Sequence, residues 1–332
     1  MAFLYSFNLG FSAPLASGPC DIFASGGNKC VAAHSTVRAM FAEFSSALYQ
    51  VQRKSDNTTK DIGVTSAGGF ADSKEQDAFC AGTDCFIFRI YDQSESGNHL
   101  DIAPPGGAHR AKDAPANATA DPLTVGGHAV YSAYFEGDMG YRRDKTTGIA
   151  KDDEAETVYM VTSGKHFNDR CCFDYGNAET DNNDDGAGTM EAVYFGNANG
   201  GLNHGGAGAG PWIMADMENA LWGANKVKSN EESILHDFVT AMIKGDSGAA
   251  PGHWAIKGGD AQTGPLKSYW DGERAAGYAP MKKQGAIILG IGGDNSDGAT
   301  GTFYEGAMVE GYTSDATDDA VQANIVAAGY GK

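Results

Sequence analysis

The stretch that decides the fold begins with Glu191-Ala-Val-Tyr-Phe195, continues through the glycine-rich segment Gly196–Gly210, and ends with Pro211-Trp-Ile-Met-Ala-Asp-Met-Glu218. The two outer parts hold β-branched and aromatic residues, which favour strands. Long segments of this kind between strands are usually disordered or part of a binding site. The stretch therefore predicts two strands joined by a functional loop.

The same pattern recurs on both sides of this stretch. Further strand candidates, separated by clusters of Gly, Asn and Asp, are Cys85–Tyr91, Glu156–Thr162, His253–Ile256, Gly285–Ile291 and Thr302–Met308. A short helix running into the first strand is expected over Val31–Tyr49, and a closing helix over Asp318–Ala328. No proline-rich or serine-rich linker divides the chain, so we expect an all-β fold: one β-sandwich of two packed sheets, with a few short helices.

Composition limits the classes of partner. The 332 residues include 43 acidic and 24 basic side chains, for a formal charge of -19, and 46 glycines. Such a charge repels nucleic acids and anionic membranes, so we expect neither as a partner. No stretch after the N-terminus approaches the about 18 consecutive apolar residues that a membrane span needs.

Six cysteines fall into three pairs that are close in sequence. The smallest loops are closed by Cys20–Cys30, Cys80–Cys85 and Cys171–Cys172. A zinc site is the competing interpretation, but the spacing of His and Cys does not fit one. Cys171 and Cys172 could instead pair elsewhere or stay reduced; if they are bonded to each other, their ring offers a flat, polarizable surface on which a furanose could stack.

The cysteines favour an oxidising compartment, and two further features agree with secretion. Residues 1–17 resemble the apolar core and cleavage region of a signal peptide without its basic start, so we expect the mature domain to span residues 18–332. Sequons for N-glycosylation lie at Asn57 and Asn117. The expected location is extracellular.

Carboxylates are the best candidates for catalysis. Asp216 and Glu218 stand two apart in an expected strand and are followed by Asn219, and a period of two places both carboxylates on one face. A second candidate is Asp294, which follows an apolar strand and two glycines. Cleavage of a glycosidic bond needs two such groups. Spacing leaves open the alternative that Glu218 and Asp294 are an edge-strand charge and a turn residue.

Other chemistries fit less well. No Gly-x-Ser-x-Gly nucleophile elbow is present, and the segment Gly290–Asn295 fails the dinucleotide-binding spacing. The run Asp181–Asp185 lacks the Gly and terminal Glu of an EF-hand loop, which favours a solvated acidic loop over a calcium site. We therefore expect no metal and no cofactor.

Long, irregular motifs carry a resemblance to one known family. They are Gly18–Ile22, Cys30–Thr36, Ile90–Ser94 with Gly97–Leu100, Ala103–Gly107, Cys171–Thr180, Gly210–Met214 with Asp216–Asn219, and Gly285–Ser296 with Gly301–Gly306. Together they resemble the catalytic domain of glycoside hydrolase family 54, the fungal α-L-arabinofuranosidase B type, over nearly all of residues 18–328.

The resemblance implies a fold, an activity and roles for individual residues. It implies a concanavalin A-like, LamG-like β-sandwich, or jelly roll, that removes terminal arabinofuranose from arabinoxylan and arabinan of plant cell walls with retention of configuration. Separately, we expect the protein to be a monomer. Glu218 is implied to be the nucleophile and Asp294 the general acid and base. The bonded Cys171 and Cys172 would lie against the sugar. Its hydroxyls would be held by Asp216, Asn219 and the backbone of Gly293. The family's other disulfides fall on Cys20–Cys30 and Cys80–Cys85.

The sequence departs from the family in two places. A stacking tryptophan is expected shortly before Gly210, but Gly201-Leu-Asn-His-Gly-Gly206 has only His204 as a ring. Another furanose, such as galactofuranose, therefore stays open as the substrate, as does a non-catalytic, lectin-like sugar-binding module. The family's β-trefoil domain is not expected after Lys332, so we expect weaker attachment to insoluble polymer.

Overall fold

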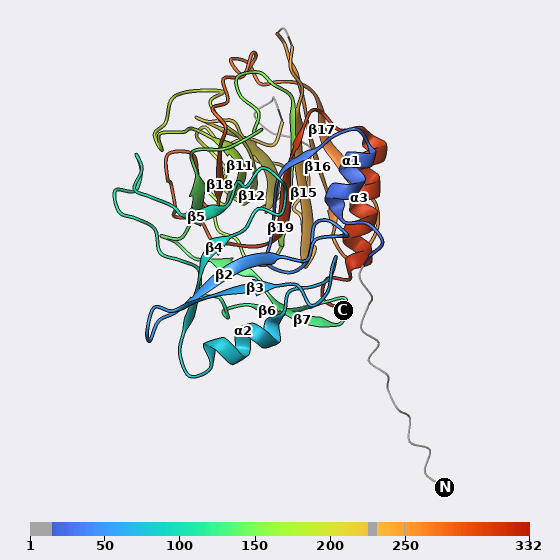
Figure 1. The fold of residues 1–332 in the computed structure, drawn as a ribbon. Helices are drawn as coiled ribbons and strands as arrows, with labels where there is room; N and C mark the ends of the chain where they lie inside the picture. Colours follow the sequence, from blue (N-terminus) through green and yellow to red (C-terminus); the bar gives the residue numbers. More distant parts are fainter. Residues whose placement is uncertain (1–14, 225–230, 249) are drawn as a thin grey trace.

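Two large antiparallel sheets pack face to face in the computed structural model of this chain, which describes residues 15–224, 231–248 and 250–332 (Figure 1). One sheet has seven strands, with β8 paired to β19 beside the order β1-β19-β10-β15-β16-β17. These strands are β1 Cys30–Ser35, β8 Ala133–Phe135, β10 Glu156–Ser163, β15 Phe238–Gly245, β16 His253–Asp260, β17 Lys267–Glu273 and β19 Gly301–Glu310.

The other large sheet has ten strands in the order β14-β13-β12-β11-β18-β9-β5-β4-β2-β3. Its strands are β2 Ala47–Arg53, β3 Thr59–Gly63, β4 Cys85–Ile90, β5 Leu100–Ile102, β9 Tyr141–Arg143, β11 Asp174–Ala178, β12 Glu191–Gly196, β13 Trp212–Asp216, β14 Leu221–Trp222 and β18 Ala286–Leu289. A separate hairpin pairs β6 Pro122–Val125 with β7 His128–Tyr131. The expected β-sandwich is thus confirmed.

Side-chain alternation assigns the two faces of the ten-stranded sheet. On β13, Ile213 and Ala215 point into the main core between the sheets, while Trp212 and Met214 belong to a smaller apolar cluster on the opposite face. Asp216 lies on the same face as Trp212 and Met214 because side chains along a strand alternate. The outer face of this sheet therefore carries polar side chains where β13 ends, and loops cover them.

Three helices complete the fold. Helix α1 Pro19–Ser25 packs against α3 Asp315–Ala328 beside the seven-stranded sheet, and α2 Ser73–Cys80 lies near the hairpin (Figure 1). None of the helices in the described ranges is long and apolar enough to cross a bilayer.

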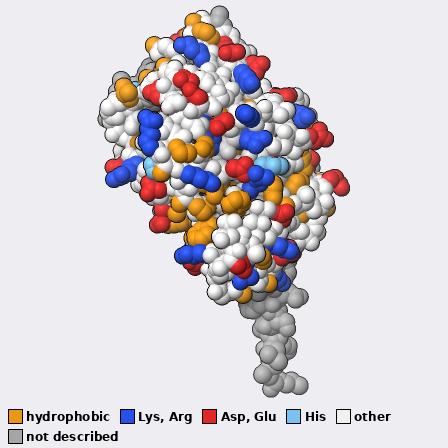
Figure 2. Space-filling model, turned by 60° about the vertical axis from the view of Figure 1, so that its left-hand side comes forward, with side chains coloured by type: hydrophobic (Ala, Val, Ile, Leu, Met, Phe, Trp, Pro, Cys, Tyr) orange, Lys and Arg blue, Asp and Glu red, His pale blue; other side chains and the backbone are white. Residues whose placement is uncertain are grey.

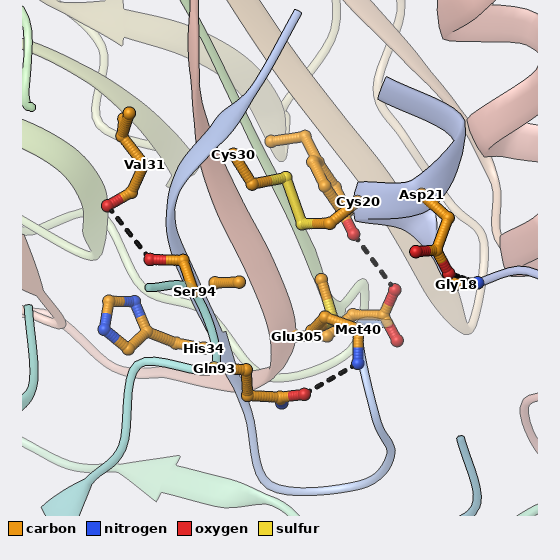
Figure 3. Close-up of a disulfide and its surroundings, with 12 residues drawn as sticks. Gly18, Cys20, Asp21, Cys30, Val31, His34, Met40, Gln93, Ser94 and Glu305 are labelled. Atoms are coloured by element: carbon orange, nitrogen blue, oxygen red, sulfur yellow. Dashed lines mark hydrogen bonds between the residues drawn. A yellow bond between two sulfur atoms is a disulfide. The ribbon is translucent and has the colours of Figure 1, made fainter. Parts of the chain in front are cut away.

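Disulfides tie two of these helices to neighbouring strands. Cys20 of α1 is bonded to Cys30 at the start of β1 (Figure 3), and Cys80 at the end of α2 is bonded to Cys85 at the start of β4. Around the first disulfide, the side chain of Gln93 accepts a hydrogen bond from the backbone N–H of Met40 at 2.7 Å. These contacts hold the N-terminal segment on the sandwich.

The prediction of a helix over Val31–Tyr49 is wrong. Residues 30–35 form β1, which pairs with β19 at one end of the seven-stranded sheet. All six residues are buried, including His34, whose ring bonds Tyr175 and the carbonyl of Asn98. A strand buried on both faces loses the alternation of polar and apolar residues by which strands are recognised. The expected closing helix begins three residues earlier than predicted, at Asp315.

Candidate active site

A single pocket on the outer face of the ten-stranded sheet collects most of the predicted site residues. Its volume is about 190 Å³, smaller than the roughly 300–1,000 Å³ of pockets for drug-sized ligands. The lining residues are Cys171, Leu202, Asn203, Asp216, Glu218, Asn219, Ala220, Leu221, Gly292, Gly293, Asp294 and Ser296. The pocket thus fits one small ring, and it brings Glu218 and Asp294 together from positions far apart in the chain.

The turn between β13 and β14 aims Glu218 into the pocket. Strand β13 ends at Asp216, and both Glu218 and Asn219 adopt left-handed backbone conformations, with φ of 67° and 62°. The N–H of Glu218 donates to Asp216 Oδ1 at 3.1 Å, and the Tyr278 hydroxyl donates to the carbonyl of Glu218 at 2.7 Å. Asp216 and Glu218 therefore share the pocket because of this turn; the period-two argument for them was wrong, since Glu218 lies beyond the strand.

Asp294 lies in the loop that follows β18. Its Oδ1 accepts hydrogen bonds from the backbone N–H and the hydroxyl of Ser296, at 3.0 and 2.6 Å. The next residue, Asn295, has a φ of 68° and donates to buried Asp113 at 2.8 Å. The loop is thereby anchored on both sides of Asp294. Both hydrogen bonds to its carboxylate use one oxygen, which leaves the other oriented by the same contacts.

The bonded pair Cys171–Cys172 forms one wall of the pocket. Cys171 is exposed and lines the pocket, whereas Cys172 is buried behind it. The Ser296 hydroxyl lies 3.9 Å from Cys171 Sγ, and Asp216 Oδ2 lies 3.3 Å from Cys172 Sγ. The sulfurs therefore stand between the segments that carry the two candidate catalytic carboxyls.

Buried carboxyls crowd beneath the pocket. Burial raises the pKa of Asp216 to about 7, and burial together with the charges of Asp216 and Glu179 raises the pKa of Glu218 to about 11. Burial and the charge of Asp216 also raise the pKa of Asp174. When groups couple this closely, protons belong to the cluster rather than to one residue. At neutral pH the cluster therefore holds protons.

Comparisons with known proteins agree with this geometry. A family model described as the catalytic domain of α-L-arabinofuranosidase B matches residues 19–331. The chain belongs to this family. It is 53% identical to α-L-arabinofuranosidase B of Aspergillus kawachii over 331 residues, which cover 97% of this chain and 65% of that protein. A probable α-L-arabinofuranosidase B of Aspergillus flavus is 53% identical over 95% of this chain and 63% of its own length.

Solved structures of the α-L-arabinofuranosidase B family superpose well on this chain. An arabinofuranosidase complexed with arabinofuranosyl-α-1,2-xylobiose matches with a TM-score of 0.89 and 52% identity, covering 94% of this chain and 65% of that one. A family 54 α-L-arabinofuranosidase soaked with a cyclic sulfate inhibitor matches with the same TM-score and 53% identity, covering 94% of this chain and 66% of that one. The chain thus spans about two thirds of the length of these relatives.

The rim of the pocket differs from what the family resemblance leads us to expect. Where a stacking tryptophan is expected, Leu202 lines the pocket and is 65% exposed. His204 packs instead on Trp222, with ring centroids 4.2 Å apart, behind the rim. Asn219 is exposed, and its side-chain amide contacts Asp184 of the acidic loop. The acidic loop is therefore part of the rim.

Several residues of this family site were missed from the sequence. Asp174 and Glu179 are buried beneath the pocket, and Arg142 bonds the carbonyls of Glu179 and Gly293. Asp174 alternates with Tyr175, which faces the core, so a period-two analysis of the motif Cys171–Thr180 would have placed Asp174 on the outer face. Nothing local in the sequence of β9 indicates the role of Arg142, which depends on strand order.

The predicted glycosylation sites lie away from the pocket. Asn57 is exposed, with a φ of 58°, between β2 and β3. Asn117 is half-buried, and its Oδ1 accepts hydrogen bonds from the backbone and hydroxyl of Thr119. The geometry thus favours Asn57 as the more accessible acceptor.

Proposed function

We propose that this chain is a retaining, exo-acting α-L-arabinofuranosidase that releases terminal arabinofuranose from arabinoxylan or arabinan. The observation that carries the proposal is the convergence of Glu218 and Asp294 on one small pocket beside Cys171–Cys172. Membership of the α-L-arabinofuranosidase B family supports the choice of sugar. A pocket with room for a single ring supports release of terminal groups rather than cleavage within a chain.

In the first step, Glu218 attacks the anomeric carbon and forms a covalent glycosyl-enzyme. Asp294 donates a proton to the departing glycosidic oxygen, so the leaving group departs as a neutral alcohol. The contacts from Ser296 to one oxygen of Asp294 fix the carboxyl plane and turn its second oxygen to this task. The left-handed turn at Glu218 fixes the line of attack.

In the second step, Asp294 is ionised and acts as a base. It takes a proton from an incoming water, whose oxygen attacks the anomeric carbon and displaces Glu218. Two displacements at the same carbon restore the original configuration. The released sugar is arabinose, and both carboxyls return to their starting protonation.

Other pocket residues are proposed to hold the sugar. Asp216, Asn219 and the backbone of Gly293 lie within the lining and offer polar groups to hydroxyls, while Cys171 and Cys172 offer a polarizable face to the ring. The hydroxyl contacts then select the furanose and its orientation.

We further infer that residues 18–332 work as one extracellular, monomeric domain on plant cell-wall polysaccharide. The three disulfides support an oxidising compartment. The expected signal remnant, residues 1–17, lies mostly outside the described residues, which begin at Leu15. Acidic and basic side chains are interspersed on the face seen in Figure 2. That face therefore has no large area of a single charge that would bind a charged partner.

The test is arabinose release from arabinan and from an aryl α-L-arabinofuranoside. Wild type is compared with Glu218→Gln, Asp294→Asn and a control, Asp84→Asn, which removes an exposed carboxylate that pairs with Lys54 and does not line the pocket. We expect the first two variants to lose nearly all turnover and the control to keep it. Wild type that binds arabinan without releasing arabinose would instead indicate a lectin-like module.

One observation bears on a second candidate substrate. Leu202 leaves the outer wall of the pocket without the expected aromatic ring. A furanose with a larger exocyclic group, such as galactofuranose, has room at such a rim. Comparing kcat/KM for aryl arabinofuranoside and aryl galactofuranoside decides between the two, and we expect arabinofuranoside to be preferred.

A further inference from the structure

The segment of residues 103–113 packs directly behind the loop that carries Asp294. In this segment, the backbone N–H of Ala108 donates to the carbonyl of Asp294 at 2.9 Å. A Cβ on Gly106 would lie 2.4 Å from the Cβ of Asn295 and 2.7 Å from the carbonyl oxygen of Asp294, so glycine is required for this close approach. The segment therefore fixes where the backbone of Asp294 lies.

His109, which belongs to the same segment, contacts two carboxyls at once. Its ring Nδ1 lies 3.3 Å from Asp113 Oδ1 and also contacts Asp297 Oδ2. Asp113 Oδ1 already accepts a hydrogen bond from the side-chain amide of Asn295 at 2.8 Å, so this oxygen is an acceptor and the ring Nδ1 carries the hydrogen. The ring thus bridges one carboxyl of its own segment and one of the loop that carries Asp294.

Through these contacts His109 reaches both neighbours of Ser296, which are Asn295 and Asp297. The backbone N–H and the hydroxyl of Ser296 donate to Asp294 Oδ1, at 3.0 and 2.6 Å. The residue that orients the carboxyl of Asp294 is therefore held on each side by a contact that leads back to one imidazole ring.

The two carboxyls depend on this ring. Among the described residues, no lysine or arginine forms an ion pair with Asp113 or Asp297. One oxygen of each lies within 4.8 Å of the other and of a ring nitrogen of His109. At neutral pH, two carboxylates this close repel each other unless a donor lies between them. Removing the ring is therefore expected to displace Asn295 or Asp297, and with them the carboxyl of Asp294.

We propose that His109 is a positioning residue for the general acid: it holds Asp113 and Asp297 together and so keeps the carboxyl of Asp294 aimed at the departing glycosidic oxygen. His109 does not line the pocket, and no bond to it changes during the reaction. The inference rests on the proposed function, because it assigns Asp294 as the general acid. It implies a dependence on the leaving group. A misplaced acid slows the departure of an alcohol, which must be protonated, but hardly affects a dinitrophenolate, which leaves without a proton.

The experiment measures kcat/KM, which reports formation of the glycosyl-enzyme, for methyl α-L-arabinofuranoside and for a dinitrophenyl α-L-arabinofuranoside at neutral pH. In His109→Leu, kcat/KM for the methyl substrate is expected to fall about ten- to a hundredfold, while that for the dinitrophenyl substrate stays within about threefold of wild type. In His109→Asn, the side-chain amide can replace Nδ1 and donate one hydrogen to each carboxyl, so both values should stay within about threefold of wild type. The control, His236→Leu, removes a partly exposed histidine that pairs with Asp260 and does not line the pocket, and it should leave both values unchanged.

The outcomes separate this inference from the proposed function. Wild type that releases no arabinose contradicts the function itself. If wild type is active, equal losses with both substrates in His109→Leu indicate only a structural role and overturn the inference, as does the absence of any loss. The same selective loss in His109→Asn as in His109→Leu also overturns it, because the donor at Nδ1 would then not matter. If His109→Leu does not fold, Asp297→Ala, which removes one end of the bridge, decides by the same selective loss.

A bound metal ion is the competing interpretation of this cluster, because one histidine and two aspartates can also ligate a divalent cation. Wild type dialysed against EDTA is therefore measured with the same two substrates, and we expect no change in either value. A loss with the methyl substrate that zinc or manganese restores would show a metal site and overturn the inference.

Discussion

Asp216 contacts both the disulfide and the backbone of Glu218, the proposed nucleophile: Oδ2 lies 3.3 Å from Cys172 Sγ, and Oδ1 accepts the N–H of Glu218 at 3.1 Å. One buried carboxyl thus fixes the spacing between the sulfur surface and Glu218. Because both contacts are short, a change in the disulfide is expected to move Asp216 and, through it, the backbone of Glu218.

Removing this disulfide is expected to weaken substrate binding. In the double variant Cys171→Ala, Cys172→Ala, the ring loses its sulfur contact, so KM for an aryl arabinofuranoside should rise about two- to tenfold. The matched control is Cys80→Ala, Cys85→Ala, which opens a disulfide far from the pocket. We expect that control to lower the melting temperature, with KM unchanged. Equal KM for the first variant and wild type would contradict a sugar-binding role for the sulfurs.

Stability is expected to fall as the pH rises through the weakly acidic range. Burial raises the pKa of Asp113 to about 6 and that of Asp216 to about 7, so the folded protein holds protons that the unfolded chain releases near pH 4. The free energy of unfolding should therefore be highest near pH 4 and decrease up to about pH 7. Denaturant unfolding at pH 4.5 and 7.5, chosen as roughly the two ends of that window, measures it.

The variant Asp113→Asn provides the check on that pH dependence. An asparagine keeps an acceptor for Asn295 but cannot titrate. The free energy of unfolding should therefore decrease less steeply with pH than in wild type. A curve as steep as that of wild type would show that Asp113 does not contribute.

A buried ion network around Lys283 is expected to be essential for stability. Lys283 lies 2.9 Å from Glu191 and 3.3 Å from Glu156, and all three side chains are buried. Lys283→Met leaves two buried carboxylates with less compensation, which should cost about 3–5 kcal/mol of unfolding free energy. Lys282→Met, at an exposed neighbour, should change it by less than about 0.5 kcal/mol.

Much of the architecture could be predicted from local sequence patterns. Strands such as Glu156–Ser163 and Glu191–Gly196 were recognised from their apolar and aromatic runs. Strand β15, Phe238–Gly245, was missed. Its penultimate residue is Lys244, a residue typical of surfaces, which is buried here because Asp318 lies 2.7 Å away on α3. Only the tertiary structure shows that pairing.

The site was predictable where a motif holds several of its residues and not where strand order brings them together. The segments with Glu218 and Asp294 were found because each combines acids with turn-forming residues. Glu179 follows β11, and Arg142 lies on β9. The two residues come close only because the sheet order β11-β18-β9 places these strands near each other, although they are far apart in sequence. The left-handed φ at Glu218 was likewise not expected, because that residue was assigned to the strand.

The most direct test of the central claim, that Glu218 and Asp294 act on one sugar, is to trap the covalent intermediate. Asp294→Gly, treated with an aryl α-L-arabinofuranoside whose leaving group needs no acid, should form the glycosyl-enzyme quickly and hydrolyse it slowly. Intact-protein mass spectrometry should then show one added arabinosyl unit, and peptide mapping should place it on Glu218. An adduct on Asp216 or any other residue, or no adduct from a variant that still turns over, would contradict the account.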